Sequence, residues 1–505
     1  MPVTFSSFLR IVLAMTLAGT LGIARADEDV KDRPQANAVE HREVGKGVLR
    51  LLPADAVTEH SIDTPRGKLA YTATAGTLAF YDQSGEQSAS VFYTAYVAKG
   101  APANRPLTFV FNGGPGAASA FLHLGLVGPR ILDFGAEVHE ATRANLRDNP
   151  DTWLNFTDLV LIDPIGTGWS RAVKREDAKS FWGVQADAGA MAKAVALYVA
   201  KNNRAGSPKY LFGESYGGFR AAKTARALQN EQGILVSGIV MLSPLLEGWL
   251  TFGDDQSALN AALQLPSLAA AELERKNAFN PDALAAAEKF AMTEYLTTLA
   301  GAPPKGDAAK TFYERVAKMS GVPVDSVTQA RGFAANVYLK TLRAPEGKIV
   351  SRYDATFAAD DPYPERRTAR SPDPILDVVT RAYGGAMASY ARNELGFKTE
   401  MTYTLLASDV QWDWQSGGRL QASAEDDLRT LLAYDPSFRL LIAHGYSDMI
   451  TPYAATRYVL DHLPAFDPPG RAQLKLYRGG HMLYLDPESR KAFSADAGAF
   501  YRGGE

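Results

Sequence analysis

The chain has 505 residues, of which 46% are hydrophobic and 22% are charged, and its formal net charge at pH 7 is -3. This composition is ordinary for a globular protein and excludes a fibrous or intrinsically disordered chain. A net charge so close to zero gives no electrostatic reason to expect binding to nucleic acid or to an anionic membrane surface. Cysteine is absent, which excludes thiol catalysis, cysteine-ligated zinc and disulfide bonds.

The amino-terminal residues have the pattern of a secretory signal peptide. A segment that ends in the positive charge of Arg10 precedes the apolar stretch 11–23, and Ala24-Arg-Ala26 then supplies an A-x-A cleavage site. The alternatives are a membrane anchor or a buried helix. The apolar stretch is too short to span a bilayer, which takes about 20 consecutive apolar residues, and no later segment offers that length. We predict cleavage after Ala26 and a periplasmic or secreted bacterial protein with no stable membrane insertion.

Strands and helices are then predicted in alternation. Lys68–Thr74 and Thr77–Asp82 are expected to flank a glycine turn and, with a third strand at 90–98, to form an antiparallel edge. Short strands that are apolar on both faces are predicted at 107–111, 159–163, 210–212, 238–242 and 439–443. Helix-forming segments lie between them at 181–202 and 217–229. This pattern is typical of a mostly parallel sheet flanked by helices, so the predicted fold class is α/β.

The stretch 251–417 breaks this alternation. It contains no comparable buried strand and is rich in Ala, Glu and Leu at helical spacing. Because buried strands resume after it, we favour a mainly helical cap inserted into one fold over an independent second domain. The predicted organisation is a signal peptide (1–26), a core in two parts (27–250 and 418–505) and the cap insertion between them.

The clearest chemical motif is Gly213-Glu-Ser-Tyr-Gly217, which lies between a predicted strand and a predicted helix. In the α/β-hydrolase fold, a G-x-S-x-G sequence forms a strained turn, with glycines beside the serine to avoid steric clashes. The turn places the serine Oγ above the sheet, at the positive end of a helix. We therefore predict that Ser215 is a nucleophile, in preference to a purely structural glycine-rich turn.

A serine nucleophile needs an acid and a base, which in this fold follow it along the chain in that order. The histidines after Ser215 are His444, His462 and His481. His481 is favoured as the base, because it lies in a glycine-rich loop directly after a strand. Asp448, on the loop after the strand 439–443, is the predicted acid, whereas Asp461 and Asp467 lie beyond the next helix.

Acyl transfer also needs paired amide donors for the oxygen of its tetrahedral intermediate. One donor is expected from Tyr216, the residue that follows the nucleophile. The second is expected from the loop Asn112-Gly-Gly-Pro-Gly116, where glycines let the backbone approach a reacting carbonyl group. Taken alone, this loop could equally be an ordinary Gly-Pro turn.

Together these segments resemble the serine carboxypeptidase family of α/β-hydrolases. The matching motifs, in the family's order, are Asn112-Gly-Gly-Pro-Gly116, Asp151-Thr-Trp-Leu-Asn155, Leu161-Ile-Asp-Pro-Ile-Gly-Thr-Gly-Trp-Ser170, Gly213-Glu-Ser-Tyr-Gly217, Gly445-Tyr-Ser-Asp448 and Gly479-Gly-His-Met482. The resemblance implies that Ser215, Asp448 and His481 form a catalytic triad. It also implies that the backbone N–H groups of Gly114 and Tyr216 form the oxyanion hole.

The resemblance further implies how a free carboxyl terminus would be recognised. Asn112 and Glu214 hold the positions whose side chains bind the substrate's terminal carboxylate, for which the glutamate must carry a proton.

Two positions depart from the family. Ala117-Ala-Ser119 replaces the usual Cys-Ser-Ser, and Leu126 stands where some members carry a second carboxylate-binding glutamate. We therefore expect weaker recognition of a free carboxyl terminus, with the fold and the triad unaffected.

The favoured function is a serine carboxypeptidase that cleaves C-terminal peptide bonds through an acyl-enzyme on Ser215. An esterase, amidase or acyltransferase with the same triad, acting on a small acyl substrate, is the alternative enzyme. An inactive binding protein on this scaffold is disfavoured by the complete triad. No metal cluster, phosphate-binding loop or dinucleotide fingerprint is found in the sequence, so we expect no cofactor.

Overall fold

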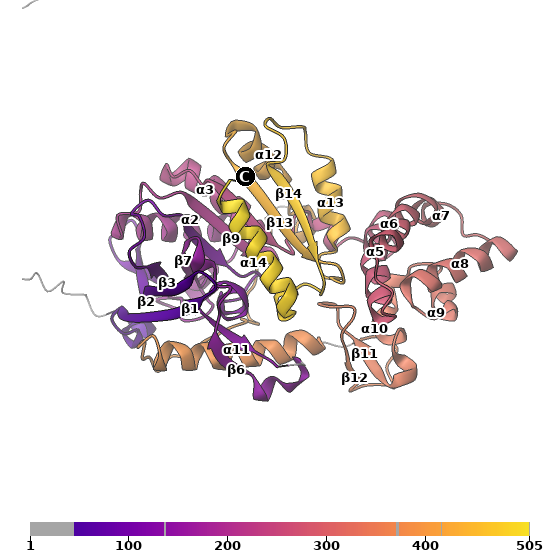
Figure 1. Cartoon of the computed structure of the whole chain (residues 1–505), viewed down its shortest axis with the longest axis horizontal. Helices are drawn as coiled ribbons and strands as arrows, with labels where there is room; N and C mark the ends of the chain where they lie inside the picture. Colours follow the sequence, from indigo (N-terminus) through magenta and orange to yellow (C-terminus); the bar gives the residue numbers. More distant parts are fainter. Residues whose placement is uncertain (1–44, 136–137, 370–372, 416, 504–505) are drawn as a thin grey trace, which may run out of the picture. The chain divides into compact units, whose positions relative to one another are not determined.

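The computed structural model describes residues 45–135, 138–369, 373–415 and 417–503. The predicted signal peptide lies outside these ranges. A ten-stranded mixed sheet forms the centre of the described chain (Figure 1). Its strands, in spatial order, are β1 (Ala56–Thr64), β2 (Gly67–Tyr81), β3 (Gln87–Ala98), β7 (Asp158–Ile162), β4 (Leu107–Phe111), β9 (Lys209–Glu214), β10 (Gly238–Leu242), β13 (Arg439–Gly445) and β14 (Ala472–Tyr477), with β8 (Arg171–Ala172) paired to β3.

The direction of the strands confirms the predicted α/β class. β2 is antiparallel to both of its neighbours, β1 and β3, and β3 is antiparallel to β7. From β7 to β14, every neighbouring pair is parallel. Every residue of β4, β7 and β10 is buried, as expected of parallel strands that are covered on both faces.

The predicted glycine turn in the antiparallel edge is wrong. We expected separate strands at Lys68–Thr74 and Thr77–Asp82, but β2 continues through Gly76 for 15 residues. A Cβ atom on residue 76 would lie 2.6 Å from the carboxylate carbon of Asp55, whose Oδ1 accepts a 3.0 Å hydrogen bond from the Thr77 amide. The glycine therefore makes room for a side chain that packs against the strand.

Different helices cover the two faces of the sheet. On β10, Ile239 and Met241 point to one face and Val240 and Leu242 to the other, as the two-residue period of a strand requires. The first face packs against α2 (Val184–Lys201), α3 (Tyr216–Ala227), α12 (Glu425–Tyr434) and α13 (Tyr453–Asp461). The second packs against α11 (Pro374–Asn393) and α14 (Pro487–Tyr501). Both faces are thus closed, which leaves the carboxyl ends of the strands for a site.

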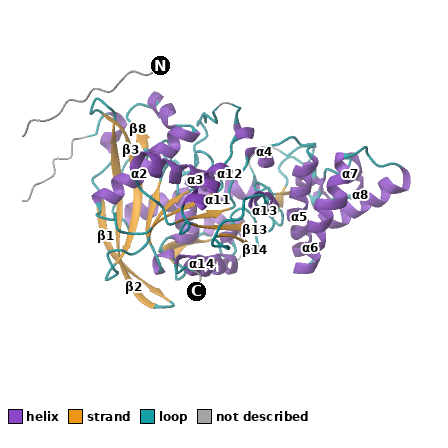
Figure 2. Cartoon of the chain, turned by 90° about the horizontal axis from the view of Figure 1, so that it is seen from above, coloured by secondary structure: helices purple, strands orange, loops and turns teal. Residues whose placement is uncertain are grey.

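The segment 251–417 contains two parts that pack differently. Its first helices, α5 to α8, contact one another (Figure 2) and enclose a core that includes Leu268, Phe290 and Phe312. The elements of this part are α5 (Ala258–Arg275), α6 (Pro281–Phe290), α7 (Leu296–Ala300), α8 (Gly306–Ser320), α9 (Val324–Gln329), α10 (Tyr338–Thr341), β11 (Lys348–Val350) and β12 (Ala358–Asp360). From α11 onward, the chain shares the core of the sheet. A single cap over the whole segment stays a prediction.

The remaining short elements lie within the loops that follow the strands. They are α1 (Ala120–Leu122), α4 (Gly248–Thr251) and the antiparallel pair β5 (Arg130–Asp133) and β6 (Asn145–Asp148). Over the described ranges, no helix has both the length and the hydrophobicity needed to cross a membrane.

Candidate active site

Ser215 lies on a sharp turn between β9 and α3. Its backbone has φ 61° and ψ -127°, a conformation that residues with a side chain rarely adopt. A Cβ atom on residue 213 would lie 1.9 Å from the Gly217 carbonyl oxygen, and one on residue 217 would lie 2.6 Å from that of Phe111. The Ser215 amide donates a 2.9 Å hydrogen bond to the Leu242 carbonyl oxygen. The turn thus depends on both glycines, as the G-x-S-x-G motif predicts.

The loops after β13 and β14 bring Asp448 and His481 together. Asp448 Oδ2 lies 2.9 Å from His481 Nδ1, and both side chains are buried. Burial acts to lower the pKa of His481, but the charge and hydrogen bond of Asp448, together with Glu214, raise that pKa above its ordinary value. The imidazole can therefore take up a proton while Asp448 holds its Nδ1–H.

Neighbouring donors fix the orientation of Asp448. Its Oδ1 accepts hydrogen bonds from the amides of Ile450, at 2.8 Å, and Thr451, at 3.1 Å. The Thr451 hydroxyl lies 2.9 Å from Asp448 Oδ2 and 2.9 Å from the Ser243 carbonyl oxygen, either of which can accept its single proton. The same hydroxyl is 3.2 Å from His481 Nδ1. Thr451 thus contacts both members of the pair.

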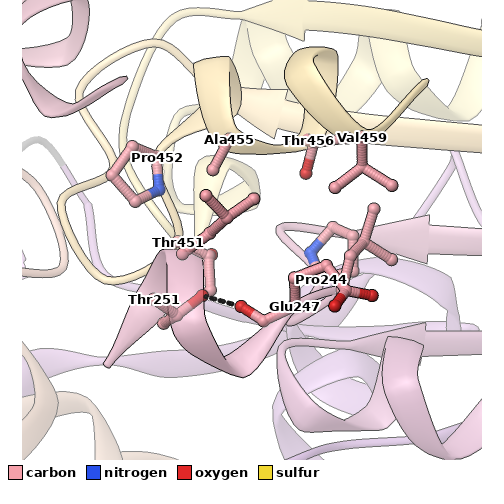
Figure 3. Close-up of a pocket in the computed structure, with 10 residues that line it drawn as sticks. Pro244, Glu247, Thr251, Thr451, Pro452, Ala455, Thr456 and Val459 are labelled. Atoms are coloured by element: carbon pink, nitrogen blue, oxygen red, sulfur yellow. Dashed lines mark hydrogen bonds between the residues drawn. The ribbon is translucent and has the colours of Figure 1, made fainter. Parts of the chain in front are cut away.

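The loop that carries Asp448 is backed by packed side chains. Pro244 and Thr251, which follow β10, face Pro452 and Val459 (Figure 3). Pro452 is the N-cap of α13, and Val459 lies on that helix. The cavity enclosed between them has a volume of about 10 Å³, which is too small for a substrate group. A substrate needs a larger space, which a second cavity beside the same loop provides.

That space is a cavity of about 250 Å³. Ser215 and His481 both line it, together with Asn112, Gly114 and Glu214. Within the described ranges, the Ser215 hydroxyl makes no hydrogen bond to His481. Catalytic hydrogen bonds are often long without substrate and tighten in the reacting complex. The predicted nucleophile and base are therefore brought to one cavity, but not into direct hydrogen-bond contact.

The glycine loop after β4 lies against the turn at Ser215. A Cβ atom on residue 113 would lie 2.6 Å from the Tyr216 amide nitrogen, so this approach requires glycine. Gly114 has φ 102°, which likewise favours glycine. Tyr216 is the first residue of α3, so its amide has no acceptor within the helix. Gly114 and Tyr216 both line the cavity, where their amides can serve a substrate oxygen.

Asn112 and Glu214 form a hydrogen-bonded pair beside Ser215. Asn112 Oδ1 accepts a 3.0 Å hydrogen bond from the Leu122 amide, which turns Nδ2 toward Glu214 Oε2, 2.5 Å away. The Tyr484 hydroxyl lies 3.2 Å from both carboxylate oxygens of Glu214. Burial raises the pKa of Glu214 to about 7, although His481, Tyr484 and Asn112 each act to lower it. The site therefore holds a carboxyl group that is poised between its neutral and charged forms.

The other candidate residues lie away from the cavity. His444 is buried on β13, where its Nε2 lies 2.8 Å from Thr456 Oγ1 and burial lowers its pKa to about 4. His462 follows α13 and lies 2.6 Å, through Nδ1, from the Tyr458 carbonyl oxygen. Leu126 is fully buried in the core and does not line the cavity. Neither histidine competes with His481 for Ser215.

Sequence reasoning missed Tyr353, Thr451 and Tyr484, which all contact the predicted site. Tyr353 and Tyr484 lie far along the chain from His481 and Glu214, the groups that they contact. Thr451 follows Asp448 on the same loop but forms no part of a recognised motif. Only Tyr484 carried a weak signal, since it lies shortly after His481 on the same loop. Among the residues that the structure describes, no group of three or more His, Asp or Glu side chains is arranged to hold a metal ion.

The parallel sheet, the strained serine turn and the order of the site loops define the α/β-hydrolase class. Within that class, the family model for serine carboxypeptidases matches residues 70–473, so the chain belongs to the serine carboxypeptidase family. Family and fold together support a hydrolase activity.

Individual relatives resemble the chain in part or in fold. Serine carboxypeptidase-like 44 of Arabidopsis thaliana is 34% identical over 82 residues, which span 16% of this chain and only 16% of that relative. Kex1Δp, a prohormone-processing carboxypeptidase from Saccharomyces cerevisiae, aligns with a TM-score of 0.53 at 15% identity over 86% of this chain and 91% of its own. A proline iminopeptidase from Mycobacterium smegmatis has a TM-score of 0.38 at 16% identity, over 85% and 98%. The similarity to the Kex1Δp structure concerns the fold alone.

Proposed function

We propose that the protein is a serine carboxypeptidase that cleaves C-terminal peptide bonds through an acyl-enzyme on Ser215. In this mechanism, His481 takes the Ser215 hydroxyl proton as Oγ attacks the scissile carbonyl carbon, and then gives that proton to the departing amine. A water molecule, activated by the same imidazole, releases the acyl group. Asp448 holds the Nδ1–H tautomer of His481 and stabilises the imidazolium that forms in each step.

The carbonyl oxygen gains negative charge in this reaction. We propose that the amides of Gly114 and Tyr216 stabilise it as an oxyanion hole. Backbone donors that are already oriented need no reorganisation when the charge develops, and the loss of one such donor typically costs 10²- to 10³-fold in kcat. The close approach of the glycine loop to the Tyr216 amide supports this assignment.

The observation that carries the proposal is the Asn112–Glu214 pair beside the nucleophile. A generic hydrolase has no need of a buried carboxyl group next to its serine, since burying an unpaired charge is unfavourable. A substrate carboxylate, by contrast, can accept hydrogen bonds from Asn112 Nδ2 and from a protonated Glu214. Burial raises the pKa of Glu214 to about 7, so the group keeps its proton under acidic conditions.

The proposal is tested with one peptide prepared as a free acid and as a C-terminal amide. The amide removes the negative charge and replaces an acceptor oxygen with a donor, which leaves polar groups mispaired at a cost of about 1–3 kcal/mol. We expect kcat/KM for the amide to be lower by roughly 5- to 150-fold. Because Leu126 provides no second carboxylate ligand, the lower part of this range is expected. Equal rates at pH 6 would leave an esterase or amidase function instead.

We also propose that the enzyme is exported to the periplasm or secreted, after removal of residues 1–26. The charged start, the apolar stretch and the A-x-A site of the sequence support this proposal. Mass spectrometry of the protein recovered from the native export pathway should find Asp27 as its first residue. Recovery of an intact Met1 from that material would contradict it.

A further inference from the structure

Residues 351–355, which we name the bracing segment, touch both loops that carry the Asp448–His481 pair. The His481 amide donates a 2.6 Å hydrogen bond to the Tyr353 carbonyl oxygen. On the other loop, the Met449 amide donates to the Arg352 carbonyl oxygen at 3.1 Å, and the Ala355 amide donates to the Ser447 carbonyl oxygen at 3.0 Å. One short segment is thus hydrogen-bonded to His481 itself and to both neighbours of Asp448.

The side chain of Asp354 adds a bond to the same loop. Its Oδ1 accepts hydrogen bonds from Ser447 Oγ, at 2.7 Å, and from the amide and hydroxyl of Thr356, at 2.9 and 2.6 Å. Ser447 is fully buried and directly precedes Asp448. Since three donors converge on one oxygen, Asp354 is held in place and can in turn hold Ser447.

The bracing segment is anchored on its far side to a helix of the core. Ser351, which is fully buried, donates from Oγ to Asp373 Oδ1 at 2.7 Å, and the Arg352 amide donates to Asp373 Oδ2 at 2.8 Å. Asp373 is the N-cap of α11, where its Oδ1 also accepts from the Ile375 amide at 3.0 Å. The segment therefore links the catalytic loops to a helix that packs on the sheet.

This arrangement also explains the glycine that precedes His481. A Cβ atom on residue 480 would lie 1.9 Å from the Tyr353 carbonyl oxygen, so any other residue there would push the segment and the His481 loop apart. The Tyr353 ring meets the His481 ring edge-on, at 90° and a centroid distance of 5.2 Å, and it lines the cavity. The contact between segment and imidazole is thus close at both backbone and side chain.

We propose that the bracing segment positions the Asp448–His481 pair for catalysis, with Asp354 as a positioning residue that acts through Ser447. The inference rests on the proposed roles of Ser215, Asp448 and His481. Without the Asp354–Ser447 hydrogen bond, the loop at Asp448 loses its side-chain contact with the bracing segment. The contact between Asp448 and His481 then loosens. Asn112 and Glu214 lie on other elements, so the proposed binding of the substrate carboxylate does not depend on this bond.

The pH dependence of kcat/KM reports this loosening. His481 must be neutral to act as a base, so kcat/KM rises with pH through the pKa of the imidazole. Asp448 and Glu214 raise the pKa of that imidazole. The other ionisable groups around it are His444, which is buried nearby, and Tyr353, whose ring packs against it. A weaker contact with Asp448 lowers the pKa, so the acid limb moves to lower pH. A segment with a purely structural role would leave the limb in place.

The test compares Asp354→Ala, Ser447→Ala and their double variant with wild type. Displacement of a catalytic group by about 1 Å can cost 10²-fold, so we expect kcat to fall by about ten- to a hundredfold, with KM within about twofold. The acid limb should shift to lower pH in each variant. The kcat of the double variant should be no lower than that of the less active single variant, because both substitutions remove the same hydrogen bond. Asp360→Ala is the matched control and should behave as wild type, because this exposed carboxylate lies on β12, outside the bracing segment.

Each remaining outcome decides the proposal. Unchanged kcat and an unmoved acid limb in Asp354→Ala and Ser447→Ala would overturn it. If Asp354→Ala fails to fold, Ser447→Ala alone must show the shift, and Asp354→Asn, which keeps an acceptor oxygen, must retain the wild-type limb. Ser215→Ala separates this inference from the proposed function. A fully active Ser215→Ala protein would overturn the proposed function. If Ser215→Ala is inactive but the acid limb of Asp354→Ala does not move, only the inference is overturned.

Discussion

At the scale of single residues, Glu214 carries the most information about the substrate. Its carboxyl group lies one residue before the nucleophile and receives hydrogen bonds from Asn112 and Tyr484. Those donors favour the charged form, yet burial outweighs them and raises the pKa of Glu214 to about 7. Below that pH the group can donate a hydrogen bond to a substrate carboxylate, and above it the two negative charges repel each other.

Replacement of Glu214 by glutamine should therefore change the alkaline side of the pH profile. In wild type, we expect kcat/KM for a free-acid peptide to fall as pH rises through about 7. The glutamine amide remains a neutral donor at every pH, so the Glu214→Gln variant should lose this fall. Steady-state rates between pH 5 and pH 9 measure this fall in kcat/KM. The amidated peptide is the control, because its terminal NH2 group donates hydrogen bonds and ionised Glu214 can accept them. Parallel profiles for the two enzymes would contradict the assignment.

At the scale of elements, α3 joins the nucleophile to the glycine loop through Arg220. The buried guanidinium donates from Nε to Asp187 Oδ2 on α2, at 2.6 Å, and from Nη1 to the Asn112 carbonyl oxygen. Its central carbon lies 5.1 Å from the centroid of the Tyr216 ring. One side chain thus ties together two helices and the start of the predicted oxyanion loop.

Loss of this guanidinium should cost both stability and activity. Arg220→Met leaves Asp187 buried without its partner, which typically destabilises a protein by about 3–5 kcal/mol. Replacing both, as Arg220→Met with Asp187→Leu, should restore much of the unfolding free energy, since apolar pairs can replace buried ion pairs. Activity should stay low in the double variant, because the Asn112 carbonyl oxygen still lacks its donor.

Urea unfolding and kcat/KM measure the two effects separately. Arg226→Met on the same helix is the control, since Arg226 contacts Gln229 and lies away from the cavity, and it should change stability by less than about 0.5 kcal/mol. Full activity in the double variant would show that Arg220 acts on stability alone.

At the scale of the whole molecule, the cavity collects side chains from several parts of the fold. Phe121 follows the glycine loop, Leu245 and Phe252 follow β10, and Leu376 comes from α11. These side chains are apolar, and in the described chain no lysine or arginine lines the cavity. A peptide bound there must place the side chains next to the scissile bond against an apolar surface.

We therefore expect a preference for apolar residues on either side of the scissile bond. A charged side chain left unpaired against such a surface costs about 2 kcal/mol or more, which corresponds to roughly 30-fold in kcat/KM. A series of free-acid peptides that differ only in Leu, Phe, Asp or Lys at the last two positions tests this by mass spectrometry. Faster release of Asp or Lys than of Leu would show that the substrate does not occupy this cavity as proposed.

The parts of the fold that were predictable have local causes. The strands at 107–111, 159–163 and 238–242 are apolar on both faces, and only burial within a covered sheet satisfies such a run. The turn at Ser215 was visible because its strain demands glycine on both sides. The exception at Gly76 is also instructive, since a glycine needed for a distant side chain looks the same in sequence as one needed for a turn.

The sequence by itself thus determined the class of fold, the family, and the candidate residues that its motifs contain, because strand periodicity and steric limits act between neighbours in the chain. Tertiary structure alone decided the environment of those residues. The pKa of Glu214 depends on burial and on Asn112 and Tyr484, and the contacts of Tyr353 and Asp354 with the loops at His481 and Asp448 join segments that lie about a hundred residues apart. Charge and hydrogen bonding act through space, and the folded chain alone sets the distances over which they act.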